Sequence, residues 1–298
     1  MKTAIIASKE DIAGMNIKES LLKIFKFKET DEKFENNEIL ELEEDPDVKL
    51  YTINSIQTHF EDIDRKIDAD LFIFVSRHSA KSGINALTCH PIGNFNDNDL
   101  GGEEKKLCIA PSILLKKALI ELNKFKEKIN HEVTLESTHH GPFLEKPVMF
   151  IELGSQESNW NNKDATNIIA QTLIKILKSS KNSLNFLGHK KSQSDFSVNN
   201  NKNLNNDKTK STIVLGGSHY NYVANKLMLK SDIAVGHICP KHNLETLDEE
   251  MLNQMLEKTL PKPEFVMLDW KGLGKEKQRI LELLKNNNIK FERSDKFF

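Results

Sequence analysis

EVTLESTHHGPFLEKPVMFIEL, residues 132–153, joins two apolar runs through a loop that carries a pair of histidines. EVTLE and PVMFIEL have the length and apolar content that predict buried strands. Five further runs have the same character: TAIIA at 3–7, KLYTI at 49–53, LFIFV at 71–75, TIVLG at 212–216 and EFVML at 264–268. Continuous apolar runs of this kind indicate a sheet that is covered on both sides.

Helical spacing of apolar residues occupies the segments between these strands. Predicted helices lie at roughly 16–27, 111–128, 163–179, 219–230, 246–258 and 274–287, several with Ser, Thr, Asn or Asp at the N-cap position. Strands that alternate with helices of this length are typical of an α/β fold. We therefore expect a mixed, largely parallel sheet with helices on both faces.

The chain of 298 residues is expected to form one domain over 1–298. Its 38% hydrophobic content is enough for a full core. The segment 190–210 is rich in Asn, Lys and Ser and has little to bury, which predicts a flexible surface insertion. No long heptad pattern indicates obligate assembly, so we expect a monomer without a protein partner.

Composition predicts a cytoplasmic protein. No run reaches the roughly 18–20 apolar residues of a membrane helix, and the start of the chain turns polar too soon for a secretory signal. The 3 cysteines show no CxxC spacing, so neither a disulfide framework nor a thiolate zinc site is predicted. The net charge of −2 gives no overall attraction to nucleic acid.

Charge is nevertheless unevenly distributed along the chain. Residues 29–47 hold ten acidic side chains and a single lysine. A stretch without acidic residues comes later and contains Lys175, Lys178, Lys181, Lys190 and Lys191. Two interpretations stay open: the basic stretch attracts a polyanion, or both segments are solvated faces of a charged chain.

Histidines and carboxylates gather in four blocks that each follow an apolar strand. The blocks are SRHSAKSG at 76–83, ESTHHGPF at 136–143 with IELGSQESNW at 151–160, LGGSHY at 215–220, and GHICPKH at 236–242. In an open α/β sheet, the loops beyond the carboxyl ends of the strands converge on one crevice, where ligands bind. The convergence would unite six of the ten histidines with three glutamates: His78, His139, His140, His219, His237, His242, Glu136, Glu152 and Glu157.

Imidazole nitrogens with a carboxylate oxygen are the ligands expected of catalytic zinc, which leaves one position for water. We predict that His139, His219 and His237 bind one or two Zn²⁺ ions, with Glu152 as a carboxylate ligand or base. The metal would make hydroxide available at neutral pH. No compact HExxH motif is present, so the assignment depends on convergence alone. The alternative for each histidine taken singly is a packed or surface residue.

The remaining positions of the blocks supply catalytic and substrate-binding candidates. His139 and His140 would point in opposite directions in an extended chain, so that one binds a ligand while the other supports the loop. His78, Glu152 and His140 are the catalytic candidates. The substrate-binding candidates are Ser76, Arg77, Ser79, Lys81, Glu157, Asn159, Trp160, Gly216, Gly217 and Ser218.

Two of these candidates have a purely structural alternative. Gly216 and Gly217 would let the backbone approach a phosphate or an oxyanion at a helix start, but Gly-Gly is also common at such turns for conformational reasons. Trp160 would stack on a base, or it would be a buried anchor.

Together the blocks resemble the archaeal and plant type of D-aminoacyl-tRNA deacylase, a family distinct from the bacterial D-tyrosyl-tRNA deacylases. The resemblance is carried, in the same order over nearly the whole chain, by IIASKEDIAGMNI at 5–17, SRHSAKSGINALTCHPIGNF at 76–95, ESTHHGPF, IELGSQESNW, GGSHY at 216–220 and GHI at 236–238. It implies hydrolysis of the ester between a D-amino acid and tRNA, the use of zinc, and a fold related to peptidyl-tRNA hydrolases and nucleoside phosphorylases. The insertion at 190–210 departs from the family pattern.

The residues suit this chemistry. An aminoacyl ester is already activated, so a positioned hydroxide, a donor to the oxyanion and an acid for the leaving ribose oxygen are sufficient. Zinc, the backbone of 217–219 and His78 would fill those roles, while basic residues of the first block and the basic stretch would hold acceptor-stem phosphates. The alternatives are a zinc-dependent amidohydrolase or peptidase acting on small N-acyl amino acids, and a noncatalytic RNA-binding module.

Overall fold

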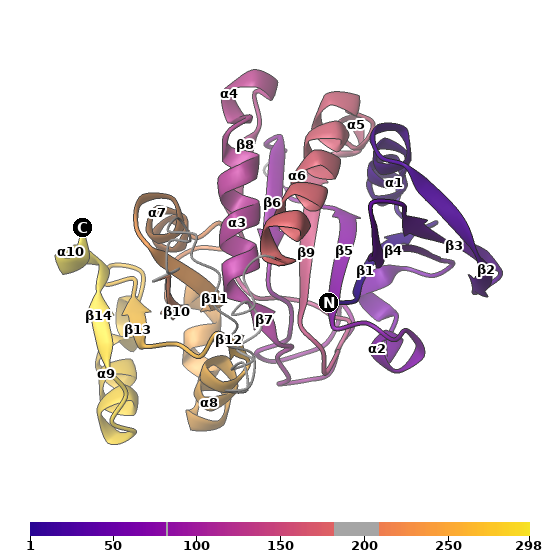
Figure 1. Cartoon of the computed structure of the whole chain (residues 1–298). Coiled ribbons are helices and arrows are strands. Elements are labelled where there is room, and N and C mark those ends of the chain that lie inside the picture. The colour runs from indigo at the N-terminus through magenta and orange to yellow at the C-terminus, as the bar shows by residue number, and fades with distance from the viewer. Residues whose placement is uncertain (82, 182–208) are drawn as a thin grey trace, which may run out of the picture.

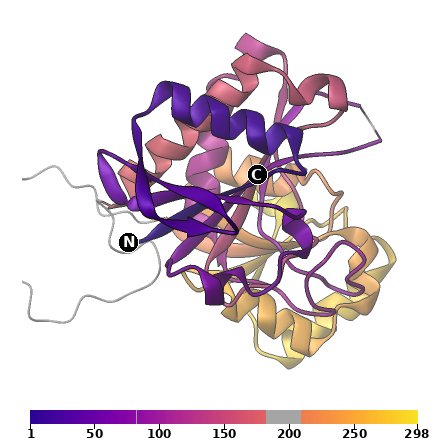
Figure 2. The same ribbon diagram turned by 90° about the vertical axis from the view of Figure 1, so that its right-hand side faces the viewer.

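The computed structural model describes residues 1–81, 83–181 and 209–298 (Figures 1 and 2). Within these residues, the strands form sheets of eight, four and two strands. The large sheet has the order β2-β3-β4-β1-β5-β9-β6-β8 and the four-stranded sheet the order β11-β10-β13-β14. Figure 1 shows the large sheet built from the first half of the chain, with the smaller sheet beside it at the C-terminal end.

The strands of the large sheet are mostly parallel. Their bounds are β1 Thr3–Ser8, β2 Phe27–Phe34, β3 Asn37–Leu42, β4 Asp45–Ile53, β5 Leu71–Arg77, β6 Ala86–His90, β8 Glu132–Leu135 and β9 Val148–Gly154. Strands β4, β1, β5 and β9 run parallel to one another, whereas β2 and β3 form an antiparallel hairpin on the β4 edge. Strand β6 is antiparallel to β9 and parallel to β8.

The smaller sheets complete the strand inventory of the described residues. The four-stranded sheet contains β10 Lys210–Leu215, β11 Ile233–Cys239, β13 Phe265–Leu268 and β14 Phe291–Arg293, all parallel. Strands β7 Ala110–Pro111 and β12 Thr259–Leu260 form the parallel two-stranded sheet. Because β7 and β12 come from distant parts of the sequence, this short sheet ties the C-terminal part of the chain to the N-terminal part.

Helices cover the sheets unequally. Helices α1 Ile12–Ile24, α3 Ser112–Asn123 and α6 Lys163–Lys181 pack on one face of the large sheet, and its other face is covered by α2 Ile63–Lys66 and by loops. The four-stranded sheet has α7 Tyr222–Lys230 on one side and α8 Glu249–Glu257 with α9 Lys277–Asn286 on the other. Three short helices complete the set: α4 Lys126–Ile129, α5 Glu157–Trp160 and α10 Ser294–Phe297.

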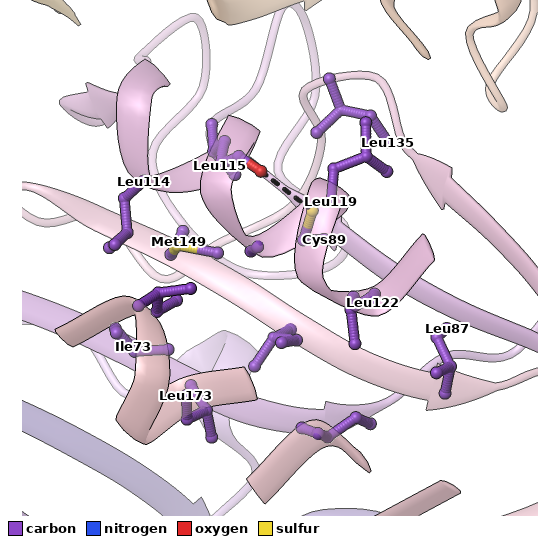
Figure 3. Close-up of a cluster of buried hydrophobic side chains, with 14 of the residues drawn as sticks. Ile73, Leu87, Cys89, Leu114, Leu115, Leu119, Leu122, Leu135, Met149 and Leu173 are labelled. Atoms are coloured by element: carbon purple, nitrogen blue, oxygen red, sulfur yellow. Dashed lines mark hydrogen bonds between the residues drawn. The ribbon is translucent and has the colours of Figure 1, made fainter. Parts of the chain in front are cut away.

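The largest core cluster lies between the large sheet and its helices (Figure 3). Ile73 of β5, Leu87 of β6 and Met149 of β9 point toward Leu119 of α3 and Leu173 of α6, and each of these side chains is fully buried. Burying a side chain of this size stabilises the folded state by about 1.5–3 kcal/mol. This apolar layer holds β5, β6 and β9 in place from one side.

The predicted fold class is confirmed. Each apolar run that predicted a strand lies in a strand, and the predicted helices are present with shifted ends. The predicted helix at 219–230 begins only at Tyr222, and the one at 111–128 is broken after Asn123. The hairpin of β2 and β3 was not predicted, because FKETDEKF lacks an apolar face.

The predicted flexible insertion at 190–210 falls, apart from its last two residues, outside the described residues. The prediction of a single domain over 1–298 stays a prediction. In the part of the chain that the structure describes, none of the helices combines the length and apolarity needed to span a bilayer.

Candidate active site

Strand alternation places a polar cluster on the face of the large sheet opposite α3 and α6. Successive side chains of a strand point to opposite faces. On β9, Met149, Ile151 and Leu153 belong to the core under the helices, so Phe150 and Glu152 point to the other face. The same alternation turns Ser76 of β5 with His78 directly after it, and Thr88 and His90 of β6, to that face.

Glu136, directly after β8, lies at the centre of the cluster. Its side chain is fully buried. Oε2 lies 2.6 Å from Nε2 of His219 and 3.8 Å from Nε2 of His139, while Oε1 lies 3.1 Å from Nδ1 of His78. A single carboxylate therefore contacts histidines that follow three different strands, β5, β8 and β10.

A second buried carboxylate, Glu152, adjoins the first through His78. Its Oε2 lies 3.4 Å from Nδ1 of His78 and 3.7 Å from Nε2 of His90. Burial alone would raise the pKa of Glu152, but the neighbouring imidazoles of His78 and His90 and their charges lower it. The pKa of Glu136 is lowered in the same way, by the hydrogen bond from His219 and the charges of His90 and His78. Both carboxylates are ionised at neutral pH.

The histidines divide into two kinds. Burial would lower the pKa values of His78 and His90, but contact with Glu152 and the charge of Glu136 raise them. Burial and neighbouring histidine charges instead lower the pKa of His139, and they lower that of His140 to about 4. His139 and His140 are therefore neutral near pH 7 and can offer lone pairs, whereas His78 is suited to carry a proton.

The adjacent histidines do not follow the extended chain that the sequence analysis assumed. His140 has a φ of 48°, in the left-handed region. As a result, both rings lie against His90, with ring centroids 4.3 Å away for His139 and 4.9 Å for His140. The ring of Phe150 lies on another side of His140, with the two ring centroids 4.8 Å apart.

His219 and Tyr220 form the outer wall of the cluster. Nδ1 of His219 lies 3.0 Å from the hydroxyl of Ser137, and its side chain is 40% exposed, the most of any histidine that contacts Glu136. The hydroxyl of Tyr220 lies 2.8 Å from Nε2 of His78. Burial raises the pKa of Tyr220, so its hydroxyl keeps its proton and can donate it.

Two cavities open beside this wall. One has a volume of about 930 Å³ and is lined by His219 and by loops that follow β10, β11 and β13. The other, of about 240 Å³, is lined by His139, His140 and the loop at 93–100. The exposed histidines of the cluster therefore face solvent-filled space on two sides.

The donor set fits a metal ion. In the described residues, three groups have ligand atoms within 4.8 Å of one another: His90 with His139 and His140, Glu136 with His139 and His219, and His78 with Glu136 and Glu152. Oε1 of Glu136 and Nε2 of His90 are buried without a hydrogen-bond partner among these residues. Orphaned polar atoms are costly to bury, and cations held by the groups that contain Glu136 and His90 would satisfy them.

His237 does not join the cluster, contrary to the prediction that it binds metal. It is fully buried within β11, its Nε2 lies 2.9 Å from the carbonyl oxygen of Cys108, and its Nδ1 lies 3.1 Å from the hydroxyl of Thr138. His237 belongs to none of the three groups of possible metal ligands, and its ring nitrogens contact a backbone carbonyl and a hydroxyl instead of another candidate ligand. His237 is a structural residue that links β11 to the loop after β8.

Several predicted substrate-binding residues instead make structural contacts within the protein. The hydroxyl of Ser76 is buried and bonds Oδ2 of Asp11 at 3.0 Å. The guanidinium of Arg77 donates to the carbonyl oxygen of Glu10 and lies 5.4 Å from the ring of Trp160. The indole N–H of Trp160 donates to the carbonyl oxygen of His78 at 3.2 Å. Trp160 is therefore an anchor that holds the loop of His78, the structural alternative noted for it.

The other predicted substrate-binding residues divide between two places. Asn159 donates to the side chain of Asn85, and Ser79, Lys81 and Glu157 are exposed and make no contact with the cluster among the described residues. Gly216, Gly217 and Ser218 directly precede His219, and the last two line the larger cavity.

Two lysines of the basic stretch form ion pairs within the fold. Lys175 lies 2.7 Å from a carboxylate oxygen of Glu121, and Lys178 lies 2.7 Å from one of Glu44.

His90 was not predicted to belong to the site, and no role was predicted for Glu136 or Tyr220. His90 ends β6, whose residues ALTCH were too short and too polar to predict a strand. The sequence signal that could have predicted this strand is alternation, because Leu87 and Cys89 are apolar whereas Thr88 and His90 are polar.

Comparison with known proteins adds an independent observation. The family described as D-aminoacyl-tRNA deacylase matches residues 65–292. D-aminoacyl-tRNA deacylases of Thermococcus kodakarensis and Thermococcus onnurineus are 33% and 32% identical to this chain, over 90% of both chains for the first and 94% and 95% for the second. A crystal structure described as a conserved protein of unknown function superposes with a TM-score of 0.80 at 25% identity, covering 99% of this chain and 96% of that one.

Proposed function

This chain belongs to the D-aminoacyl-tRNA deacylase family, and we propose that the cluster around Glu136 is the site where it performs the reaction of that family. The reaction is hydrolysis of the ester bond between a D-amino acid and tRNA, which releases the free amino acid and tRNA. The observation that carries the assignment of the site is that Glu136 contacts His78, His139 and His219 beside an open cavity.

A zinc ion is the metal that this donor set favours. Neutral imidazoles and a carboxylate are its usual ligands in catalytic sites. Glu136, His139 and His219 would hold it, because they surround a common point and two of them reach solvent. His139 is also shared with His90 and His140, which would give a second ion a place. Zinc held here would act as a Lewis acid and make hydroxide available near neutral pH.

His78 supplies the proton for the leaving ribose oxygen. The ionised Glu152 raises the pKa of His78 and favours the protonated imidazole. Because His78 is only 5% exposed, its proton would reach the substrate through the hydroxyl of Tyr220. Glu152 is thus a positioning residue and His78 the acid.

The test is release of amino acid from matched D- and L-tyrosyl-tRNA by wild type and by Glu136→Gln. We expect rapid release from the D-isomer by the wild type, and a loss of at least 100-fold in kcat in the variant, since general acid–base and metal sites contribute about 10²–10⁴-fold. Release of both isomers at equal rates would contradict the proposal.

A second substrate separates this reaction from that of a zinc amidohydrolase. N-Acetyl-D-tyrosine ethyl ester and N-acetyl amino acids lack the nucleic-acid part, and we expect them to be poor substrates. If they were hydrolysed faster than D-tyrosyl-tRNA, the amidohydrolase alternative would replace the deacylase. The matched control variant is Lys33→Gln, an exposed change on the distant hairpin of β2 and β3.

A further inference from the structure

The larger cavity beside His219 lies at the carboxyl edge of the four-stranded sheet, and we call it the sheet-end cavity. Its volume is about 930 Å³, within the range of about 300–1,000 Å³ that is typical of ligand pockets. Its walls are the loops that follow β10, β11 and β13, represented by Gly217, Lys241 and Lys271. The cavity beside His139, at about 240 Å³, is smaller than that range.

The topology of the sheet places this cavity where a ligand is expected. Strand β10 lies between β11 and β13 and is parallel to both. The chain leaves β10 through α7 to form β11 on one side, and then crosses to form β13 on the other side. In open parallel sheets, ligands bind outside the carboxyl ends of the strands at the point where the strand order reverses.

Glycines bring the backbone to the floor of the cavity. Gly216 and Gly217 have φ values of 98° and 90°, which side chains other than glycine rarely adopt. A Cβ on Gly217 would lie 2.9 Å from Oδ2 of Asp269, and one on Gly272 would lie 2.4 Å from the nitrogen of Gly217. The turns after β10 and β13 therefore pack closely at Gly217 and Gly272, with the carboxylate of Asp269 against both glycines.

Two lysines on the walls have no acidic partner. Glu245 pairs with Lys275 at 3.3 Å, and Glu276 pairs with Arg279 at 2.8 Å. Asp269 accepts a hydrogen bond from the nitrogen of Gly272. Across the described residues, no ion pair is formed by Lys241 or Lys271. Among the described residues, two unpaired lysines therefore face one carboxylate outside any ion pair, that of Asp269, so positive charge is in excess.

The chemistry of the substrate identifies the occupant, and this step rests on the proposed function. The reacting ester is carried by the ribose of the terminal adenosine, so that nucleotide must lie next to the cluster. His219 belongs to both the cluster and the cavity wall. We propose that the sheet-end cavity binds the 3′-terminal adenosine nucleotide of the tRNA, with Lys241 and Lys271 holding its phosphate.

The experiment compares two small substrates, D-tyrosine esterified to the 3′ hydroxyl of adenosine and to that of adenosine 5′-monophosphate. We expect the wild type to show a KM about 10-fold lower for the phosphorylated ester. The double variant Lys241→Met/Lys271→Met should lose this preference while its kcat, and its KM for the unphosphorylated ester, stay within about twofold of wild type. These fold-changes correspond to one charge-assisted contact, about 1.4 kcal/mol per factor of ten.

A matched control removes the same charge elsewhere. Lys230 ends α7 and Lys262 precedes β13, so both are exposed at the opposite edge of the sheet. The control Lys230→Met/Lys262→Met should keep the phosphate preference. If the double variant at 241 and 271 also keeps it, the proposal is overturned.

Binding of uncharged tRNA distinguishes failure of the proposal from failure of the proposed function. Loss of the contact with this one phosphate should reduce the slope of log Kd against log salt by about 0.7, the value per phosphate for single strands. An unchanged slope would overturn the assignment of the cavity even if the enzyme hydrolyses D-tyrosyl-tRNA. A wild-type protein that hydrolyses no ester would instead refute the proposed function. The salt slope would still test whether the sheet-end cavity binds a tRNA phosphate.

Discussion

The two faces of the large sheet are formed by neighbouring residues of the same strands, yet they differ sharply around Glu152. On β9, Ile151 and Leu153 are packed among leucines and isoleucines of the helices, whereas Glu152 between them faces His78 and His90. The first face is closed and has only apolar contacts. The second contains ionised carboxylates and neutral histidines beside open cavities.

The difference shows how one strand provides both stability and chemistry. Burying two carboxylates and several histidines is unfavourable unless each is paired. The apolar face supplies the free energy that holds β5, β6 and β9 rigid, and the polar face uses that rigidity to keep the cluster in place. Substitutions on the apolar face should therefore change the unfolding free energy, and substitutions on the polar face should change kcat.

The largest effect is expected from Glu152→Gln. Loss of the carboxylate lowers the pKa of His78, so less of the acid is protonated and kcat should fall about 10³-fold. The adjacent control Ile151→Val should change kcat by less than twofold and cost about 1 kcal/mol of unfolding free energy. Rates on D-tyrosyl-tRNA and urea titrations give both numbers. Equal kcat for the two variants would contradict the separation of the faces.

Leu153→Ala should have the reverse effect. The side chain is fully buried in the core beneath the helices, so its truncation should lower the unfolding free energy by about 2–5 kcal/mol. The kcat of the molecules that remain folded should stay within about twofold of wild type. A large loss of kcat without a change in the urea midpoint would show that the apolar face takes part in the chemistry.

His237 predicts a pH dependence of stability that does not come from the cluster. Burial lowers its pKa to about 4, while in the unfolded chain the value is near 6.5. The unfolded state therefore binds more protons between these values, so the stabilisation is complete above about pH 6.5 and is lost as pH falls toward 4. This residue alone should make the unfolding free energy about 2 kcal/mol lower at pH 5 than at pH 7.

The variant His237→Gln provides the comparison for this measurement. Because it has no titrating group at 237, its unfolding free energy should fall less steeply between pH 7 and pH 5 than that of the wild type. Parallel pH curves for the two proteins would show that His237 does not titrate in this way.

A smaller effect on kcat is expected from Tyr220→Phe. The substitution removes one hydroxyl, which lies 2.8 Å from Nε2 of His78, and leaves the ring in place. Because this hydroxyl passes the proton of His78 to the substrate, its loss should lower kcat about 100-fold with little change in stability. Unchanged kcat would remove Tyr220 from the proton path.

The sequence predicted the elements whose apolar runs are continuous and missed those in which polar and apolar residues alternate. LFIFV and PVMFIEL predict β5 and β9 because they are apolar at nearly every position. Strand β6 alternates, so it was missed, and with it the place of His90 in the cluster.

The main error at the site concerns a different kind of strand, β11, whose apolar run is interrupted by Gly236 and His237. His237 was placed in a loop because β11 was not predicted, and its burial follows from the position in that strand. The convergence of His78, His139 and His219 was predicted correctly, since each comes directly after a predicted strand. Which of their neighbours is free to bind a metal depends on hydrogen bonds across strands, and these have no signature in the sequence.

The most direct test of the account combines metal content and activity in one sample. Wild-type protein, a chelator-treated sample and the same sample after zinc is returned are assayed for bound zinc and for release of D-tyrosine from D-tyrosyl-tRNA, alongside His219→Ala and His237→Gln. We predict that chelation abolishes activity, that zinc restores it in the wild type and in His237→Gln, and that His219→Ala neither binds zinc tightly nor recovers. Rapid hydrolysis by protein that is free of metal, or restoration of His219→Ala by zinc, would contradict the assignment of Glu136, His139 and His219 as the metal site.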